Sequence, residues 1–322
     1  MTRERRVATV RRAYLGHGAL RHVSSVLQEL PKGPIVLLGS PSLDRGQRDM
    51  LEAATRVSFD EQLVTPRELD AASLERLRSD LAAVRPVAVV GCGGGTVMDA
   101  AKAISRPGPP ALVLIPKTLS GSEHTVNTSH WEGTHKKISV VGLADVAIGD
   151  PMALVTDLEV LGPGALHALA HVLATLGIPR GSAFSRLIAR AALADLLTAL
   201  ESQDVTEAGR ILFLRGAWMA AVGFALTGPK IGAHHMLVHT RAARGQHARF
   251  SARLLCSTIL NTAFYDDELA AVKPHIQDIF ERLSLVSAAW LPRVSDAQPR
   301  VSAPSLPPTL AREESLLIGA LQ

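Results

Sequence analysis

The stretch that decides the fold is VGCGGGTVMDAAK, residues 90–102. The apolar residues just before it, 87–90, predict a buried strand, and the glycines followed by helical spacing predict a tight turn into a helix. Glycine suits such a turn because it accepts positive φ and lets the backbone come close to a ligand. The first N–H groups of a helix lack partners within the helix and lie at the positive end of its dipole, so this turn can hold a pyrophosphate. A turn with a purely structural role is the alternative, since the glycine spacing differs from the usual dinucleotide fingerprint.

Strands and helices alternate through the first half of the chain. Short apolar runs predict strands at 7–10, 34–38, 87–90 and 111–115, and another run ends in DVAIGDP, residues 145–151. Periodic apolar residues predict a helix that ends near residue 30 and helices at 44–55 and 73–84. This alternation predicts a parallel sheet covered by helices on both faces. Ligands of such sheets bind beyond the carboxyl ends of the strands, where the loops that follow residues 39, 91 and 116 would meet.

From residue 165 onward the pattern is helical. Helices are predicted at 166–176, 183–200, 207–226, 234–243 and 248–263, which makes an all-helical second domain across a cleft from the first. The domain boundary is expected between 151 and 164, so that residues 1–155 form the α/β domain and 156–322 the helical domain. Residues 295–308 are rich in Pro, Ser and Ala, so 295–322 is expected to be poorly ordered.

The composition is that of a soluble globular protein. Of the 322 residues 47% are apolar, and the net charge of +4 comes from dispersed arginines without a dense basic stripe, which argues against nucleic-acid binding. Cys92 and Cys256 are far apart and form no paired motif, which fits a reducing compartment. The N-terminus lacks the apolar core of a signal peptide, and the longest apolar run, 216–228, is too short to span a bilayer. We therefore expect a cytoplasmic protein, not bound to a membrane, that acts on a small molecule.

Histidines gather in the helical half of the chain. His167 and His171 are four residues apart, so they share one face of a helix, and His235 and His239 repeat that spacing. His247 follows after a short loop. Imidazoles from facing helices can hold a divalent cation, although any one of these residues could instead have a core or surface role.

Four features follow one another along the chain: the glycine turn, PKTLSGSE at 116–123, the DP of 150–151, and the spaced histidines. In this order they resemble the iron-containing alcohol dehydrogenase and dehydroquinate-synthase-like superfamily. Within it, GAHHMLVH at 232–239 and the His-Ala at 247–248 are most similar to motifs of the maleylacetate reductases. The resemblance implies an α/β nucleotide-binding domain with a parallel sheet, followed by an all-helical domain, and it is compatible with a homodimer.

The same resemblance assigns roles to particular residues. It implies NADH or NADPH as the cofactor, bound by Ser40, Pro41, Gly93, Gly94, Gly95, Thr96, Asp99, Thr118, Leu119 and Ser122. It implies a divalent metal, iron or zinc, bound by His167, His171, His235 and His247. His239 would lie near the nicotinamide as a proton donor or relay, with His235 as a second catalytic residue. Hydroxyls that merely cap a turn are the alternative for Thr118 and Ser122, and Asp99 is expected to fix the glycine turn together with Lys102.

Individual residues bear on cofactor choice and on metal binding. Ser40-Pro41-Ser42 contains no acid that would repel a 2′-phosphate, so NADPH is expected to be used at least as well as NADH. His167 stands where the superfamily has Asp, which removes a negative charge from the metal shell and should weaken metal binding. Ala174 stands in place of a Glu, and Lys117 in place of a Thr.

We therefore expect an NAD(P)-dependent oxidoreductase that transfers a hydride between nicotinamide and a ketone or alcohol, or an enoyl carboxylate as in maleylacetate reductases. Without a metal, imidazolium groups could stabilise the developing alkoxide and donate the proton. The departures leave two alternatives: a divergent dehydrogenase for a secondary-metabolite or peptidyl alcohol, and a catalytically degenerate partner protein that keeps the nucleotide-binding fold. A phosphate-eliminating cyclase like dehydroquinate synthase is disfavoured, because residues 117–123 lack the further basic and acidic groups of that chemistry.

Overall fold

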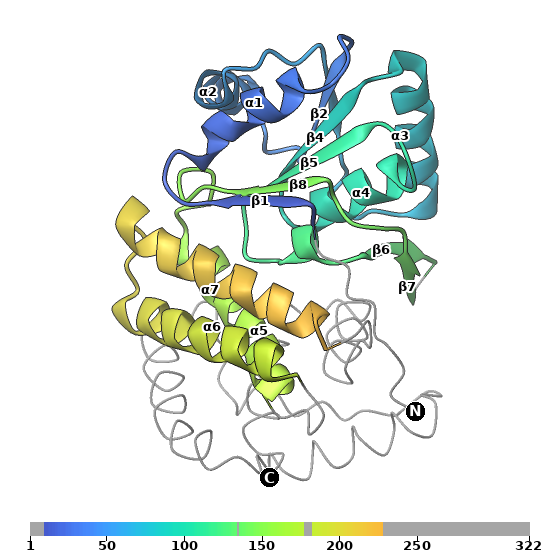
Figure 1. Cartoon of the computed structure of the whole chain (residues 1–322). Helices are drawn as coiled ribbons and strands as arrows, with labels where there is room; N and C mark the ends of the chain where they lie inside the picture. The colour runs from blue at the N-terminus through green and yellow to red at the C-terminus, as the bar shows by residue number, and fades with distance from the viewer. Residues whose placement is uncertain (1–9, 134, 177–181, 228–322) are drawn as a thin grey trace.

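A parallel sheet forms the centre of the first half of the molecule. The computed structural model describes residues 10–133, 135–176 and 182–227. The strands of the sheet are β1 (Arg12–Leu15), β2 (Ile35–Gly39), β3 (Glu61–Val64), β4 (Ala88–Gly93), β5 (Ala111–Pro116) and β8 (Val146–Gly149). They pair in the order β1-β8-β5-β4-β2-β3, and every neighbouring pair is parallel (Figure 1). The parallel sheet predicted from the alternating pattern is confirmed.

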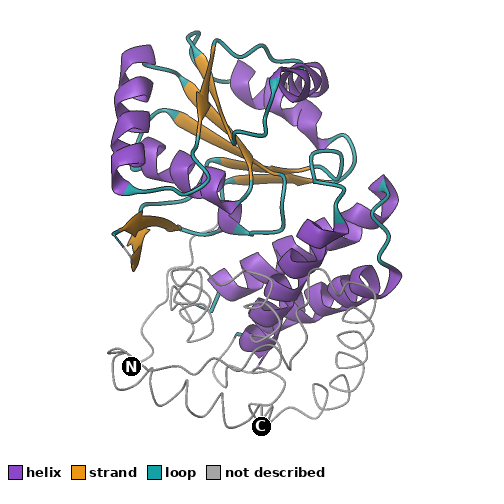
Figure 2. Ribbon diagram, turned by 180° about the vertical axis from the view of Figure 1, so that it is seen from behind, coloured by secondary structure: helices purple, strands orange, loops and turns teal. Residues whose placement is uncertain are grey.

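Helices cover both faces of this sheet (Figure 2). One face carries η1 (Ala19–Arg21), α1 (His22–Gln28) and α2 (Arg45–Thr55), and the other carries α3 (Ala71–Val84) and α4 (Gly95–Ser105). Within β2, Leu37 belongs to the first of these apolar cores, whereas Val36 and Leu38 belong to the second. Because successive side chains of a strand alternate between the two faces, a strand buried on both sides needs a continuous apolar run.

Four strands differ from the prediction. The first strand is Arg12–Leu15 rather than 7–10; of that predicted run only Val10 is among the described residues, and it lies outside any strand. Neither β3 nor the antiparallel hairpin of β6 (Asn127–Glu132) and β7 (His135–Val140) was predicted. These segments are rich in polar residues and lie at an edge or outside the main sheet, so apolar periodicity does not mark them.

The second half of the described chain is helical. It consists of α5 (Leu158–Leu176), α6 (Ala183–Ser202) and α7 (Glu207–Ala225), which lie together below the sheet in Figure 1. The last two match their predicted ranges closely, whereas α5 begins at Leu158 rather than at residue 166 and carries Pro163 in its early turns. The helices pack closely because their contacts use small residues: a Cβ on Gly216 would lie 2.8 Å from Leu196 Cγ. The predicted helices at 234–243 and 248–263, and the segment 295–322, lie outside the described residues.

α7 joins this helical half to the end of the sheet. A Cβ on Gly149, the last residue of β8, would lie 2.6 Å from Trp218 Cζ2 of α7. Arg210, which is 8% exposed, donates through Nε to the carbonyl of Pro151 at 2.9 Å. The two halves therefore meet through a glycine–indole contact and a buried guanidinium–carbonyl bond.

Two helices are long and apolar enough to cross a membrane by length and composition alone, namely α5 and α7. The longest uninterrupted apolar run, 216–228, is too short to span a bilayer, but each of these helices has a longer window that is apolar on average. The windows are 61% and 56% buried inside the molecule, as expected for core helices of a globular fold.

Candidate cofactor and metal site

The carboxyl ends of three neighbouring strands bring the predicted cofactor contacts together. Gly39 of β2 is paired with Cys92 of β4, and Gly93 of β4 with Pro116 of β5. The loops that start after these strands therefore leave the sheet at one edge. The predicted contacts that share this edge are Ser40, Pro41, Gly93, Gly94, Gly95, Thr96 and Thr118.

The glycines at the start of α4 are needed because neighbouring side chains lie too close for a Cβ atom, and not because of the backbone conformation. Gly93, Gly94 and Gly95 all lack the positive φ that the sequence suggested, and Gly94 is extended with φ −84°. A Cβ on Gly93 would lie 2.5 Å from a Val97 methyl, and one on Gly94 would lie 3.3 Å from Thr118 Oγ1. Side chains here would therefore fill the space between the turn and the loop after β5.

The same turn has the properties of an anion site. Gly94 is the N-cap of α4, and no side chain caps the first N–H groups of the helix. These N–H groups carry the positive end of the helix dipole and have no acceptor within the helix. A diphosphate would supply the missing acceptors, so the residues present fit the cofactor that the sequence predicts.

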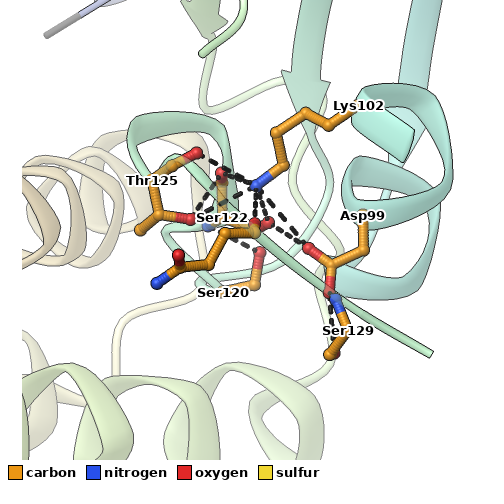
Figure 3. Close-up of polar contacts among 7 residues, drawn as sticks. Asp99, Lys102, Ser120, Ser122, Thr125 and Ser129 are labelled. Carbon is orange, nitrogen blue, oxygen red and sulfur yellow. Dashed lines mark hydrogen bonds and ion pairs between the residues drawn. The ribbon is translucent and has the colours of Figure 1, made fainter. Parts of the chain in front are cut away.

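Lys102 fastens the loop after β5 to α4 (Figure 3). Its fully buried ammonium donates to five oxygens of residues 122–127: the carbonyl and hydroxyl of Ser122 at 2.7 and 2.9 Å, those of Thr125 at 3.1 and 3.2 Å, and the carbonyl of Asn127 at 2.5 Å. Asp99 Oδ1 lies 3.6 Å from the same nitrogen. Burial lowers the pKa of Lys102, and the nearby carboxylate of Asp99 opposes that shift.

Asp99, one turn before Lys102 in α4, completes this network. It accepts the hydroxyl of Ser122 at 2.6 Å, and the N–H and hydroxyl of Ser129 at 2.9 and 2.8 Å. Asp99 and the Ser122 hydroxyl are thus engaged within the protein, and their place is to hold the loop in position. The side chain of Leu119 is buried in the core of the helical half, next to Gly164 of α5. A cofactor contact from Leu119 would have to use its main chain.

Three further polar side chains are buried where this loop meets α7. Glu123 and His124 belong to the short helix η2 (Ser122–His124), and Trp218 belongs to α7. Within the described chain, Glu123 Oε2, His124 Nε2 and Trp218 Nε1 have no hydrogen-bond partner. The rings of His124 and Trp218 meet edge to face, with their centroids 4.4 Å apart. We call these three residues the Glu123 cluster.

Burial shifts both ionisable groups of the Glu123 cluster toward their neutral forms. It raises the pKa of Glu123 to about 7, and a backbone hydrogen bond to Glu123, the charge of Lys102 and the nearby Trp218 partly oppose this shift. It lowers the pKa of His124 to about 4, and here the charge of Lys102 adds to the shift. Next to the cluster, Gly121 adopts φ +67°, and a Cβ there would lie 2.7 Å from Ala221 Cβ of α7.

The sequence did not single out the Glu123 cluster or Lys136. Lys136, on β7, lies over the ring of Trp131 at 5.7 Å from its centroid; burial lowers its pKa and Asp99 opposes that shift. Residues 127–132 are almost all polar, so no apolar alternation indicates the hairpin or the lysine that it places beside α4. Cys92 is buried with its pKa raised to about 11, so it is an unreactive thiol.

Two of the predicted metal ligands lie side by side on α5. The rings of His167 and His171 are in edge-to-face contact with centroids 4.8 Å apart, and His171 also contacts Phe224 of α7 at 4.6 Å. Two neighbouring imidazoles fit as part of a shell for iron or zinc. In the described part of the chain, no group of three or more His, Cys, Asp or Glu side chains could hold a metal. His235, His239 and His247 lie outside the described residues.

The sequence and the fold are similar to those of known reductases. The family model described as iron-containing alcohol dehydrogenase matches residues 11–151. Maleylacetate reductase 1 of Rhodococcus opacus is 30% identical over 239 residues, a match that covers 71% of this chain and 65% of that enzyme. The match thus spans slightly less than two thirds of the length of this relative, and less than half of the length of two further maleylacetate reductases.

Solved structures of similar fold align with nearly the whole length of the chain. Maleylacetate reductase from Agrobacterium tumefaciens has a TM-score of 0.76 at 23% identity, covering 99% of this chain and 98% of that one. Sulfoacetaldehyde reductase from Bifidobacterium kashiwanohense, solved in complex with NAD+, has a TM-score of 0.75 at 15% identity, covering 98% and 92%. Residues 11–151 are thus similar to the iron-containing alcohol dehydrogenase family, and the chain is similar to maleylacetate reductases.

Proposed function

We propose that the protein is an NAD(P)-dependent oxidoreductase that moves a hydride between nicotinamide and a ketone or alcohol, or an enoyl carboxylate. The observation that carries the proposal is the start of α4: a helix N-terminus without a side-chain cap, at the carboxyl edge of a parallel sheet, next to two further loops. Two similarities support it: residues 11–151 match the family model of iron-containing alcohol dehydrogenases, and sulfoacetaldehyde reductase, which has a similar fold, was solved in complex with NAD+.

The residues of the chain would divide the work as follows. The N–H groups that follow Gly94 bind the diphosphate, and the hydroxyl of Thr118 lies close enough to the turn to contact it. Lys102 and Asp99 hold the loop that carries Thr118. When bound, a reduced nicotinamide supplies the hydride. His239 donates the proton to the developing alkoxide, and His235 is a second catalytic residue.

A divalent metal, iron or zinc, is part of the proposal. His167 and His171 would supply two imidazole ligands from α5, and His235 and His247 would supply the others. When bound, the metal would polarise the substrate carbonyl. Because the shell holds no carboxylate, the metal should be held weakly.

Titration of the protein with NADH and NADPH, followed by cofactor fluorescence, tests the cofactor site directly. We expect both to bind and Gly94→Val to weaken both by at least about tenfold, because the new methyl groups occupy the space beside Thr118. Circular dichroism of the variant checks that it is folded. Absence of binding to the wild-type protein, together with stable association with another enzyme, would favour the catalytically degenerate partner instead.

Turnover and metal content test the histidines. His239→Ala should lower kcat by about a hundredfold while cofactor binding is retained. Dialysis against a chelator should abolish activity, and zinc or ferrous ion should restore it. Full activity after complete removal of metal would favour imidazolium groups as the source of electrostatic stabilisation.

We propose an enoyl carboxylate or a ketone as the substrate, in line with the name of the Rhodococcus relative. A divergent dehydrogenase for a secondary-metabolite or peptidyl alcohol is the second candidate, and a substrate panel with both cofactors distinguishes them. A soluble cytoplasmic location and a homodimer complete the proposal.

A further inference from the structure

Lys117 is held at the cofactor edge by its backbone. It directly follows β5, where its N–H donates to the carbonyl of Gly93 at 2.8 Å, and its own carbonyl accepts the N–H of Val155 at 3.0 Å. These two bonds fix the Cα atom of Lys117 beside the glycine turn. The position of the side chain is therefore set by the sheet and not by a free loop.

The side chain of Lys117 crosses the edge to the first turn of α2. Its Nζ donates to Gln47 Oε1 of α2 at 2.7 Å, although β4 lies between β5 and β2 in the sheet. Among the described residues this ammonium forms no ion pair with a carboxylate. A cation held by a neutral amide is available to an anionic ligand.

The loop after β2, which leads into α2, offers hydroxyls. Ser40 and Ser42 lie with their Oγ atoms 2.8 Å apart, so at least one hydroxyl can turn toward a ligand. The acid of this loop is Asp44, whose Oδ1 accepts the N–H of Gln47 at 2.8 Å and so caps α2. In parallel sheets of this kind, the adenosine ribose of a dinucleotide lies at the loop after the second strand, and a basic residue there accommodates a 2′-phosphate.

We propose that Lys117, together with Ser40 and Ser42, binds the 2′-phosphate of NADPH and gives the protein its preference for NADPH over NADH. The inference rests on the proposed function, because it assigns a specificity residue to the same cofactor site. The sequence pointed to the absence of a repelling acid at 40–42; the structure adds a cation that attracts. Lys117 in this role is a specificity residue and takes no part in hydride transfer.

The test compares binding of paired probes, with no need for turnover. The probes are NADPH against NADH, and 2′,5′-ADP against 5′-AMP, each titrated into the wild-type protein and into Lys117→Gln, Lys117→Arg and Lys32→Gln. Glutamine removes the charge but can still bond to Gln47. Arginine keeps the charge. Lys32 is exposed before β2, at the opposite edge of the sheet, so it controls for the loss of one positive charge.

In the wild-type protein we expect the phosphorylated probe of each pair to bind more tightly. Lys117→Gln should weaken NADPH and 2′,5′-ADP by about 10- to 100-fold, the value of a charge-assisted hydrogen bond, and change NADH and 5′-AMP by less than about threefold. Lys117→Arg should retain most of the preference, and Lys32→Gln all of it.

Two results would overturn the assignment while leaving the proposed function intact. One is equal binding of both probes of a pair by the wild-type protein, and the other is an equal loss for both probes in Lys117→Gln, which would put the lysine at the diphosphate. Failure of every probe to bind the wild-type protein would instead overturn the proposed function and this inference together.

Discussion

Two polar clusters secure the loop after β5, and they are built in opposite ways. Around Lys102, five oxygens and the Asp99 carboxylate surround one buried cation. In the Glu123 cluster, which begins one residue after Ser122, three buried polar atoms have no hydrogen-bond partner in the described chain. The first cluster holds the loop against α4 through the hydrogen bonds of Lys102 and Asp99. The second meets α7 through packing.

The difference shows how burial can be tolerated in two ways. A buried charge with enough partners remains charged and stabilises the geometry around it. A buried ionisable group without partners tends to become neutral, and its stability contribution then depends on pH. The end of the loop at the Glu123 cluster should therefore respond to pH.

The largest effect is expected at Lys102. Lys102→Met leaves the five acceptors and Asp99 without their cation, so the free energy of unfolding should fall by about 3–5 kcal/mol in urea denaturation. Lys137→Met is the matched control, because Lys137 is 52% exposed in a pair with Glu132 and should cost less than about 1 kcal/mol. Similar losses in the two variants would refute the distinct role of Lys102.

The next effect is the pH dependence from Glu123. Its pKa is raised from 4.5 to about 7 in the folded protein, so its stabilising contribution is complete below pH 4.5 and is lost as the pH rises through 7. Glu123→Gln removes this loss. Its unfolding free energy relative to wild type should rise by on the order of 3 kcal/mol between pH 4 and pH 8. A relative stability that does not vary with pH would contradict the prediction.

His124 should show an effect of similar size and opposite sign. Its pKa is lowered from 6.5 to about 4, so its contribution is present above pH 6.5 and is lost as the pH falls through 4. His124→Asn should therefore gain stability relative to wild type between pH 8 and pH 4. In the wild-type protein the two dependences oppose each other between pH 4.5 and 6.5. If both variants have the same pH profile as wild type, the Glu123 cluster does not titrate as described.

The smallest effect is expected at Gly121, where the cost of the packing contact with α7 can be separated from the cost of backbone strain. Gly121 and Gly133 have similar positive φ, +67° and +62°, but a Cβ would meet Ala221 at 2.7 Å in the first case and nothing within 4 Å in the second. Gly133→Ala should cost about 1 kcal/mol from strain, and Gly121→Ala about 1 kcal/mol more. Thermal unfolding of both variants measures the difference, and equal costs would mean that the contact with α7 yields easily.

The sequence predicted the parts of the fold that local patterns encode. Continuous apolar runs marked β2, β4, β5 and β8, because strands covered on both faces need them. Helical periodicity marked α3, α6 and α7 within a few residues. β3 and the hairpin escaped because polar residues dominate in strands that lie at an edge or outside the main sheet.

The site was predicted in part, for a physical reason. The glycine turn and the residues after β5 could be predicted from the sequence, because the loops that follow parallel strands must meet at one edge. The partners of Lys102 lie 20 to 25 residues along the chain, and no short-range pattern encodes such contacts. The Glu123 cluster likewise depends on α7, which is distant in sequence. The predicted roles of His235, His239 and His247 stay predictions.

The contacts of α7 limit how the two described halves can move. A rotation of this helix away from the sheet would have to break the bond from Arg210 to Pro151, uncover the indole beside Gly149 and open the contact at Gly121 all at once. Each interaction alone is modest, but a hinge at this seam would lose them together. The seam should therefore be rigid, so that the two described halves move together as one body.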